Sequence, residues 1–370
     1  IKIGVCNMSA RKVLLLYVGP GYKGTDVYTA NDITKIVNCG ATDYLFLNPY
    51  EINNAKANDQ ILRAEWVLSE SNIPNSVFDT TATSEQIKQI RQAMVERIDK
   101  IEKLESSTTR NYTAYVDSAV TLAKLIRAQK SNAKFWFGFP PYLDGCTPAA
   151  IRYNYYYYDY IFNAVKSKMT SAGYWSNVEG FYFGQEDIVA WYTRFNTANV
   201  NTQFDNVVVQ NMKYLSDNIH SASKKFMWIP FFRNDYRATR FGYVINKTNI
   251  FDVAFIQPNY YFDQAQTWID AVDSCVQSQA FKNGNTVIGG SKTSVTEIGP
   301  EMEVDENVLN SSAYKSRFTS YVNKFGKYIT GSGVSQRPVA FYVGTASAFR
   351  DNIVYNVVKQ FFSNGTMYHF

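Results

Sequence analysis

Apolar and aromatic residues recur along the chain in eight short runs, which are separated by longer and more polar segments. Most of the runs are nearly continuous in apolar residues, a pattern typical of parallel β-strands that are covered on both faces. The predicted strands span residues 12–18, 42–48, 133–139, 178–184, 225–231, 251–257, 295–303 and 338–344.

Most of the segments between these strands have the periodicity of a helix. The predicted helices span residues 26–38, 112–129, 205–223, 262–281, 313–329 and 346–362, and a tyrosine-rich segment, 154–160, opens another. This alternation predicts an α/β fold, a single (β/α)8 TIM barrel over residues 1–370. The gap after the second strand is oversized. We therefore expect a long helical insertion at about 49–132, with a further helix over 84–104.

The fourth predicted strand ends on an acidic residue, Glu186. Because side chains alternate along a strand, Glu186 shares a face with Gly180, Tyr182 and Gly184. Active sites of barrels made from parallel strands gather at the carboxyl ends of the strands, which is where Glu186 lies. The alternative is a solvated loop residue, as most glutamates are.

The seventh predicted strand carries several carboxylates on one face, namely Glu297, Glu301, Glu303 and Asp305. Taken alone, they are also compatible with a solvated acidic loop. Together with Glu186 they form the pair of carboxyl groups on separate strands that a glycosidase requires, one protonated and the other ionised. We expect Glu186 to be the general acid. We expect Glu301, ahead of Glu303, to be the nucleophile of a retaining mechanism or the base of an inverting one.

Amide, guanidinium and aromatic side chains cluster at the predicted strand ends. Aromatic residues make up 16% of the chain, with 28 Tyr and 25 Phe. Flat rings beside hydrogen-bonding groups suit sugars, whose faces are apolar and whose edges are polar. The predicted substrate-binding residues are Asn48, Trp136, Tyr142, Tyr182, Gln185, Phe232, Arg233, Gln257, Asn259, Tyr260 and Tyr342.

The composition argues against several other classes of function. The net charge of +5 comes from 37 basic and 32 acidic residues without a basic cluster, so nucleic-acid binding is not expected. The two histidines, His220 and His369, and the lack of a CxxC pair argue against a zinc site and a Ser-His-Asp triad. A G-x-G-x-x-G pattern begins at Gly19, but Pro20 removes a backbone donor that a phosphate would need. We expect no metal and no organic cofactor.

Four cysteines, Cys6, Cys39, Cys146 and Cys275, are compatible with buried thiols or with up to two disulfides. No apolar run reaches the roughly 18 residues of a membrane-spanning helix. The chain begins with Ile1, so an export signal could have been removed. We expect a monomer.

Four stretches, FYFGQEDI, WIPFF, FDVAFIQPNYYF and GPEMEVD, resemble a family of bacterial proteins known as DUF4855. The resemblance extends over roughly residues 10–345, and FDVAFIQPNYYF is its most specific part. It implies a secreted or surface-attached barrel that resembles TIM-barrel glycoside hydrolases. The acidic motif after the fourth strand falls on Glu186, and the motif after the seventh falls on Glu301 and Glu303.

The function predicted from the sequence is hydrolysis of a glycosidic bond in a polysaccharide or glycan. The resemblance implies a location outside the cytoplasm, either secreted, periplasmic or at the cell surface. One alternative is a non-catalytic glycan-binding barrel, which would keep the aromatic groove without a correctly spaced carboxyl pair. Another is a polysaccharide lyase, in which Arg233 would neutralise the carboxylate of the substrate.

Overall fold

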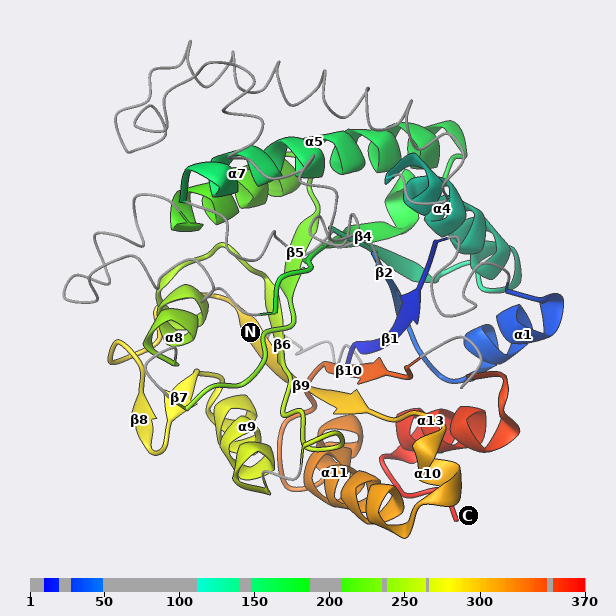
Figure 1. The fold of residues 1–370 in the computed structure, drawn as a ribbon, viewed down its shortest axis with the longest axis vertical. Helices are drawn as coiled ribbons and strands as arrows, with labels where there is room; N and C mark the ends of the chain where they lie inside the picture. The colour runs from blue at the N-terminus through cyan, green and yellow to red at the C-terminus, as the bar shows by residue number, and fades with distance from the viewer. Residues whose placement is uncertain are drawn as a thin grey trace, which may run out of the picture.

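A computed structural model of the chain describes residues 10–19, 28–48, 112–139, 148–186, 208–234, 238–263, 266–344 and 349–369. Within these residues, eight parallel strands close a barrel in the order β1-β10-β9-β6-β5-β4-β3-β2 (Figure 1). The strands are β1 (Lys12–Tyr17), β2 (Asp43–Leu47), β3 (Lys134–Gly138), β4 (Val178–Phe183), β5 (Lys225–Trp228), β6 (Val253–Ile256), β9 (Glu297–Glu303) and β10 (Val339–Tyr342). The predicted TIM barrel is confirmed, and each strand lies within a predicted run.

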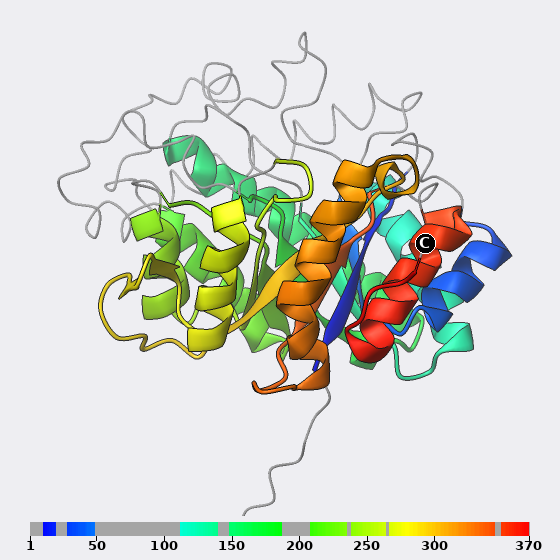
Figure 2. The same ribbon diagram turned by 90° about the horizontal axis from the view of Figure 1, so that it is seen from below.

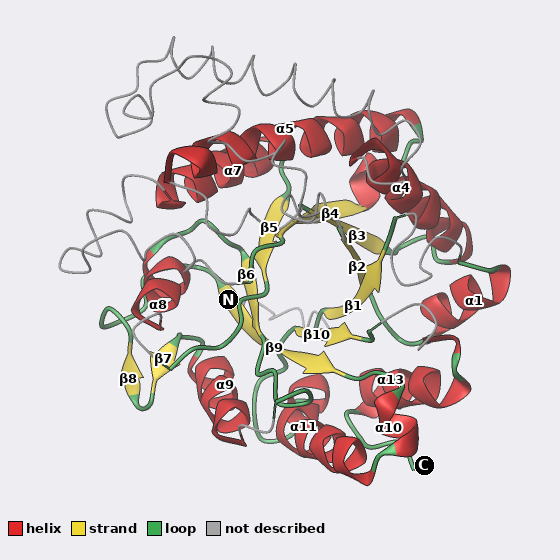
Figure 3. Cartoon of the chain, in the orientation of Figure 1, coloured by secondary structure: helices red, strands yellow, loops and turns green. Residues whose placement is uncertain are grey.

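Helices form a ring outside the strands (Figure 3). They are α1 (Ala30–Asn38), α4 (Tyr112–Gln129), α5 (Pro148–Ser171), α7 (Val208–Ser221), α8 (Ala238–Lys247), α9 (Gln266–Ser278), α10 (Asn307–Asn310), α11 (Ser312–Thr330) and α13 (Asn352–Asn364), with a 3-10 turn, η3 (Trp175–Asn177), before β4. The side view shows α11 and α13 running alongside the barrel (Figure 2). In the long insertion after β2, the helix predicted over 112–129 is confirmed as α4. The helix predicted over 84–104 lies outside the described residues.

The sequence analysis missed α8 and the short antiparallel hairpin of β7 (Lys282–Asn283) and β8 (Thr286–Val287). A glycine inside α8, Gly242, weakens the helical signal. In the structure this glycine makes room for the hairpin, because a Cβ there would lie 2.3 Å from Cβ of Ile288. Gly242 lowers the intrinsic stability of the helix, but it is needed for a tertiary contact with Ile288 that sequence periodicity does not show.

Alternation along the strands sorts the apolar side chains into two cores. On β1, Leu14 and Leu16 point outward and pack with residues of the surrounding helices. Val13 and Leu15 point inward and belong to a second cluster that fills the barrel. The period of two thus separates a large layer between sheet and helices from a smaller layer inside the barrel.

Ion pairs close the amino end of the barrel. The Arg11 guanidinium contacts Asp43 Oδ1 at 2.6 Å and Glu179 Oε1 at 2.8 Å. The Lys225 ammonium contacts the same oxygen of Glu179 at 2.7 Å. Trp136 completes this group, because its indole Nε1 donates to Asp43 Oδ1 at 2.9 Å and its ring lies 5.1 Å from the Arg11 guanidinium.

The prediction that Trp136 binds substrate is therefore wrong. The side chain is fully buried and hydrogen-bonded toward the amino end of the barrel, away from the carboxyl rim. Gly180 provides the room for it, because a Cβ at that position would lie 2.6 Å from the indole and 2.0 Å from the Lys225 carbonyl oxygen. Sequence alternation correctly gives the inward direction of Trp136 but not its height along the barrel axis.

Two of the four cysteines, Cys39 and Cys275, are buried free thiols, whereas Cys6 and Cys146 lie outside the described residues. Burial raises the pKa of Cys39 to about 11 and that of Cys275 to about 12, so both thiols are inert at neutral pH. In the part of the chain that the structure describes, the helices are too short or too polar to cross a bilayer.

Candidate active site

The carboxyl ends of β4 and β9 bring acidic side chains to the same end of the barrel. Glu186 follows β4 by three residues and is exposed. In the barrel order β4 and β9 are separated by β5 and β6, so they face each other across the barrel mouth. The predicted placement of Glu186 at the same rim as Glu301 and Glu303 agrees with this topology.

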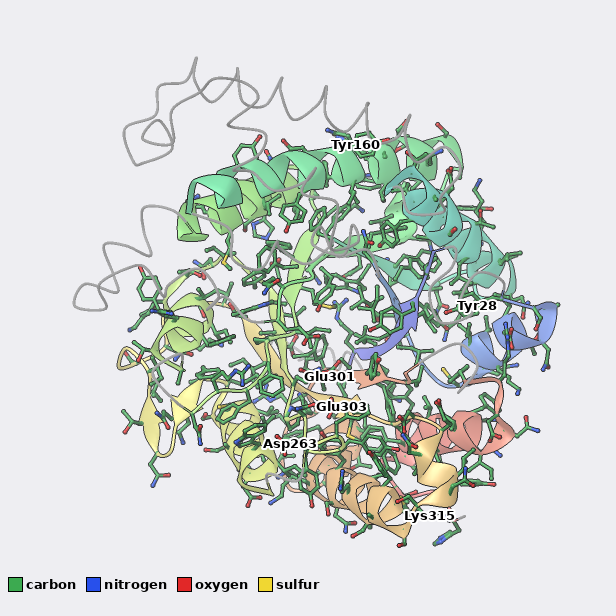
Figure 4. All side chains as sticks on the ribbon, viewed as in Figure 1. Tyr28, Tyr160, Asp263, Glu301, Glu303 and Lys315 are labelled. Carbon is green, nitrogen blue, oxygen red and sulfur yellow. The ribbon has the colours of Figure 1, made fainter. Side chains whose placement is uncertain are left out.

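Glu301 and Glu303 are inward-facing residues of β9. In the parallel register Glu301 pairs with Ala340 and Glu303 pairs with Tyr342, and both partners pack with the inner cluster. Met302, between the two glutamates, belongs to the outer core instead. Both carboxyl side chains are buried, with 2% of Glu301 and 1% of Glu303 exposed, and they lie next to each other on the β9 side (Figure 4).

Burial and neighbouring charge raise the pKa of both β9 glutamates. Burial raises the pKa of Glu301 well above its usual range, and the carboxylates of Glu303 and Glu186 raise it further. Burial also raises the pKa of Glu303 to about 8, against the opposing effect of a hydrogen bond from the Tyr321 hydroxyl. Within the described ranges, no lysine or arginine forms an ion pair with either glutamate. Both side chains are therefore easier to protonate than an exposed glutamate.

The charge of Glu186 also contributes to the raised pKa of the β9 glutamates. Glu186 raises the pKa of Glu301 and of Glu303, although burial is the larger cause in both. Tyr182, inside the barrel on β4, has its pKa raised by burial and then by Glu186 and Glu301. We predicted that Glu301 would be the ionised partner of Glu186. The structure instead raises the pKa of Glu301, because this side chain is the buried one.

The two oxygens of Glu301 have different surroundings. The Gln257 side chain hydrogen-bonds to the carboxyl group, which favours its ionised form. Oε2 is buried and has no hydrogen-bond partner among the described residues. A buried carboxylate oxygen without a donor is costly, so the group is more stable with a proton on it. The surroundings of Glu301 therefore favour its protonated form.

The chain beyond β6 provides three of the predicted binding residues. Gln257 continues the inward face of β6 through a bridge with Phe231. Asn259 has a φ of 51°, a left-handed conformation that asparagine tolerates better than most residues, and it is partly exposed. Tyr260 is also partly exposed, and its ring packs edge-on against Tyr321 with 5.9 Å between ring centroids.

Other predicted binding residues also lie at the ends of their strands. Asn48 follows β2 and Gln185 follows β4, and both are mostly buried. Tyr342 ends β10, where its ring meets that of Tyr17 edge-on at 5.9 Å. Arg233 follows β5 with its guanidinium 4.0 Å from the centre of the Phe231 ring. Tyr142 lies outside the described residues.

Phe232 is not a binding residue, contrary to the prediction. It is 1% exposed, belongs to the outer core and stacks on Phe281 with ring centroids 5.7 Å apart. The bridge between Phe231 and Gln257 extends the β5–β6 pairing beyond the regular strands. Phe232 then packs toward the helices, and the ring of Phe231 meets that of Trp268 on α9 edge-on at 5.5 Å.

Sequence reasoning missed two aromatic residues at this end of the barrel. Tyr17 ends β1 and packs against the inner cluster, and its place on the inward face could have been found from the alternation of Val13 and Leu15. Tyr321 lies in the middle of α11, and its hydroxyl donates to Glu303 Oε2 at 2.5 Å. No strand periodicity could have revealed Tyr321, because a helix supplies it.

A Ser-His-Asp arrangement exists elsewhere but does not form a catalytic triad. His220 Nε2 lies 2.8 Å from Asp252 Oδ2, and Nδ1 lies 3.2 Å from the Ser216 hydroxyl. Ser216 is 2% exposed and its hydroxyl donates to the carbonyl oxygen of Ile250 at 2.7 Å. The serine lies beside the residues that precede β6, away from the carboxyl ends of the strands, so the arrangement connects α7 to the start of β5 and β6.

No group of three or more His, Cys, Asp or Glu side chains in the described ranges is placed to hold a metal ion. The carboxylates at the mouth thus do not form a metal centre with one another. Their geometry fits acid–base or nucleophilic chemistry by the side chains themselves.

Several solved structures are similar to the chain at 8% sequence identity. One is a mutant tryptophan synthase alpha-subunit from the hyperthermophile Pyrococcus furiosus, with a TM-score of 0.40 and coverage of 96% of each chain. Another is tryptophan synthase from M. tuberculosis with BRD0059 bound, with a TM-score of 0.40 and coverage of 97% of this chain and 94% of that chain. No curated protein matches the chain in sequence.

The profile of the family described as "Domain of unknown function (DUF4855)" matches residues 158–357. This span begins in α5 and ends in α13, so it contains β4 with Glu186, β9 with both buried glutamates, and α11 with Tyr321. More than half of the 370 residues are covered, and the family resemblance seen in the sequence is confirmed. The chain belongs to the DUF4855 family.

Proposed function

We propose that this protein is a glycoside hydrolase that cleaves a glycosidic bond in a polysaccharide or glycan. The observation that carries the proposal is that Glu186, after β4, and the buried glutamates of β9 lie at the same mouth of the barrel. Glycosidases need two carboxyl groups from opposite sides of the scissile bond, one able to give a proton and one able to act as nucleophile or base.

The proposed mechanism is retention of configuration at the anomeric carbon. A carboxylate of β9 attacks that carbon while Glu186 gives a proton to the leaving oxygen. Water then attacks the covalent intermediate and returns a proton to Glu186. Retaining enzymes hold the two carboxyl groups about 5–5.5 Å apart, and inverting enzymes about 6.5–9.5 Å apart. Two strands that face each other across a barrel mouth favour the shorter separation.

Sugar recognition is assigned to the aromatic and amide side chains around these carboxyl groups. The rings of Tyr260 and Tyr342 provide flat apolar faces, and Gln257 and Asn259 provide amide groups. The polysaccharide partner is part of the proposal. We also propose, from the family resemblance alone, that the protein acts outside the cytoplasm, and we expect it to be a monomer.

The test is a panel of polysaccharides and glycans incubated with the wild-type chain and with Glu186→Gln, with reducing ends measured over time. We expect hydrolysis of at least one polymer and a loss of roughly 10²–10⁴-fold in rate in the variant, the scale of general acid catalysis. The configuration of the new reducing end, followed by NMR, should match that of the cleaved bond. Binding of a polymer without hydrolysis would favour a glycan-binding barrel instead.

A further inference from the structure

The hydroxyl of Tyr321 connects α11 to both β9 and the chain after β6. It donates to Glu303 Oε2 at 2.5 Å, the short end of the range for a hydroxyl that donates to a carboxylate. The same oxygen accepts the backbone N–H of Tyr260 at 2.9 Å and the backbone N–H of Tyr261 at 3.2 Å. One buried hydroxyl thus holds the reactive strand and the segment that carries the proposed sugar-binding tyrosine.

These contacts fix the direction of the hydrogen bond to Glu303. A phenol has one proton to donate, and a backbone N–H can only donate to it. Because two N–H groups of the chain after β6 point at the Tyr321 oxygen, its own proton is left for Glu303. Glu303 Oε2 therefore accepts this hydrogen bond, and a donor to the carboxyl group favours its ionised form. The Tyr261 N–H also favours the ionised form of Glu303.

Glu301 is in the opposite situation. Its Oε2 is buried and meets no donor among the described residues, so this oxygen is the better place for a proton. The remaining acidic groups that act on the pair are Glu186 from the end of β4 and Asp305 from the end of β9. When ionised, each adds negative charge, which favours one proton on the pair. The donor from α11 decides which of the two glutamates stays ionised.

We propose that Tyr321 is a positioning residue that holds Glu303 as the ionised carboxylate of the pair, and that Glu303 is the nucleophile of the proposed glycosidase. Glu301 keeps the proton and is therefore the neutral member of the pair. In the reaction an oxygen of Glu303 bonds to the anomeric carbon as the glycosidic bond breaks, and the leaving oxygen takes the proton of Glu186. Water then gives its oxygen to the anomeric carbon and a proton to Glu186, which releases the Glu303 carboxylate. This assignment replaces our expectation of Glu301 ahead of Glu303.

The first test does not depend on activity. Full-length protein labelled with 13C at the glutamate side-chain carboxyl carbon is titrated by NMR, with Glu301→Gln and Glu303→Gln used to assign the two signals. We expect Glu303 to titrate at lower pH than Glu301. In Tyr321→Phe the proton affinity of Glu303 should rise by about tenfold or more, because a donor to its ionised form is lost.

The matched control is Tyr328→Phe. Tyr328 lies on the same helix and also donates to a carboxylate, Asp273 Oδ1 at 2.6 Å, but between α9 and α11. It should leave the Glu303 titration unchanged, although it removes a buried hydrogen bond as Tyr321→Phe does. A Glu303 signal that does not move in folded Tyr321→Phe, or a Glu301 signal that titrates first, would overturn the assignment.

The second test uses the reaction and rests on the proposed function. On a polymer that the wild type cleaves, sodium azide should restore turnover to Glu303→Ala and give a glycosyl azide of inverted anomeric configuration. The same treatment should not rescue Glu301→Ala, and rescue of Glu301→Ala alone would assign the nucleophile to Glu301. If no polymer is cleaved, the proposed function fails, while the NMR titration still decides whether Tyr321 controls Glu303.

Discussion

The two ends of the barrel contain the same kind of residue in opposite electrostatic settings. At the amino end, Glu179 contacts two cations, Arg11 and Lys225. Burial alone would raise the pKa of Glu179, but the hydrogen bonds and charges of these cations lower it to about 2. At the carboxyl end, burial raises the pKa of Glu303 to about 8, and its charged neighbours are acidic.

This contrast separates a structural carboxylate from a candidate catalytic one. A buried charge must be paired, or it takes up a proton. At the amino end the carboxylates form ion pairs with Arg11 and Lys225, and this network closes the barrel. The carboxyl end leaves Glu301 and Glu303 without an ion pair among the described residues, and such perturbed groups are concentrated at functional sites. Composition cannot distinguish these two cases, because only the neighbours differ.

The largest effect is expected at the paired end. Arg11→Met removes the cation between Asp43 and Glu179 and leaves two carboxylates with less compensation, which should lower the free energy of unfolding by about 3–5 kcal/mol. Urea denaturation measures this change in the free energy of unfolding. Lys213→Met removes an exposed ion pair within α7 and should cost less than about 1 kcal/mol. Equal losses in the two variants would show that the amino-end network is no more important than a surface pair.

A smaller effect of opposite sign is expected at the carboxyl end. The folded state holds a proton on Glu301 up to a raised pKa, whereas the unfolded state loses it near the ordinary value of 4.5. Wild-type stability should therefore fall as pH rises above that value, by at most about 1.4 kcal/mol per pH unit for this group. Glu301→Gln removes this dependence and should become progressively more stable relative to wild type as pH rises from 5 to 8.

The matched control for this measurement is Glu297→Gln. Glu297 lies on the same strand and the same alternating face, but it is exposed at the amino end. Its replacement should leave the pH dependence of stability as it is in the wild type. If Glu301→Gln and Glu297→Gln have the same pH dependence as the wild type, Glu301 is ionised in the folded state and the contrast between the two ends disappears.

The smallest expected effect concerns sugar binding at the rim. Tyr260→Ala removes a partly exposed ring beside the glutamates and should weaken binding of a glycan by roughly 1–3 kcal/mol, the scale of stacking on an aromatic ring. Calorimetric titration with oligosaccharides measures this loss. An unchanged affinity together with lower stability would assign the ring to packing against Tyr321.

The sequence predicted the barrel well because its strands are buried on both faces and therefore appear as continuous apolar runs. It also predicted that Glu186, Glu301 and Glu303 meet at one rim, since all parallel strands end there. The sequence does not show how far along the barrel axis an inward side chain lies. For this reason Trp136 was wrongly assigned to the site.

Other features escaped prediction because they depend on tertiary contacts. Phe232 was misassigned because an extra bridge after β5 shifts where the strand ends. Tyr321 was missed because it reaches the rim from a helix. Spacing also could not show which of Glu301 and Glu303 is the nucleophile. The two differ in their hydrogen-bond donors, because Tyr321 donates to Glu303 and no described group donates to Oε2 of Glu301.

The central claim is that the carboxyl end of the barrel hydrolyses glycosidic bonds through its glutamates. The most direct measurement is the initial rate of reducing-end release from a cleaved polymer by wild type, Glu303→Gln and Glu297→Gln, three proteins that differ at one strand. We predict that Glu303→Gln loses at least roughly 10³-fold, comparable to losing a nucleophile or its equivalent, and that Glu297→Gln keeps the wild-type rate. Full activity in folded Glu303→Gln, or no release from any polymer by the wild type, would contradict the claim.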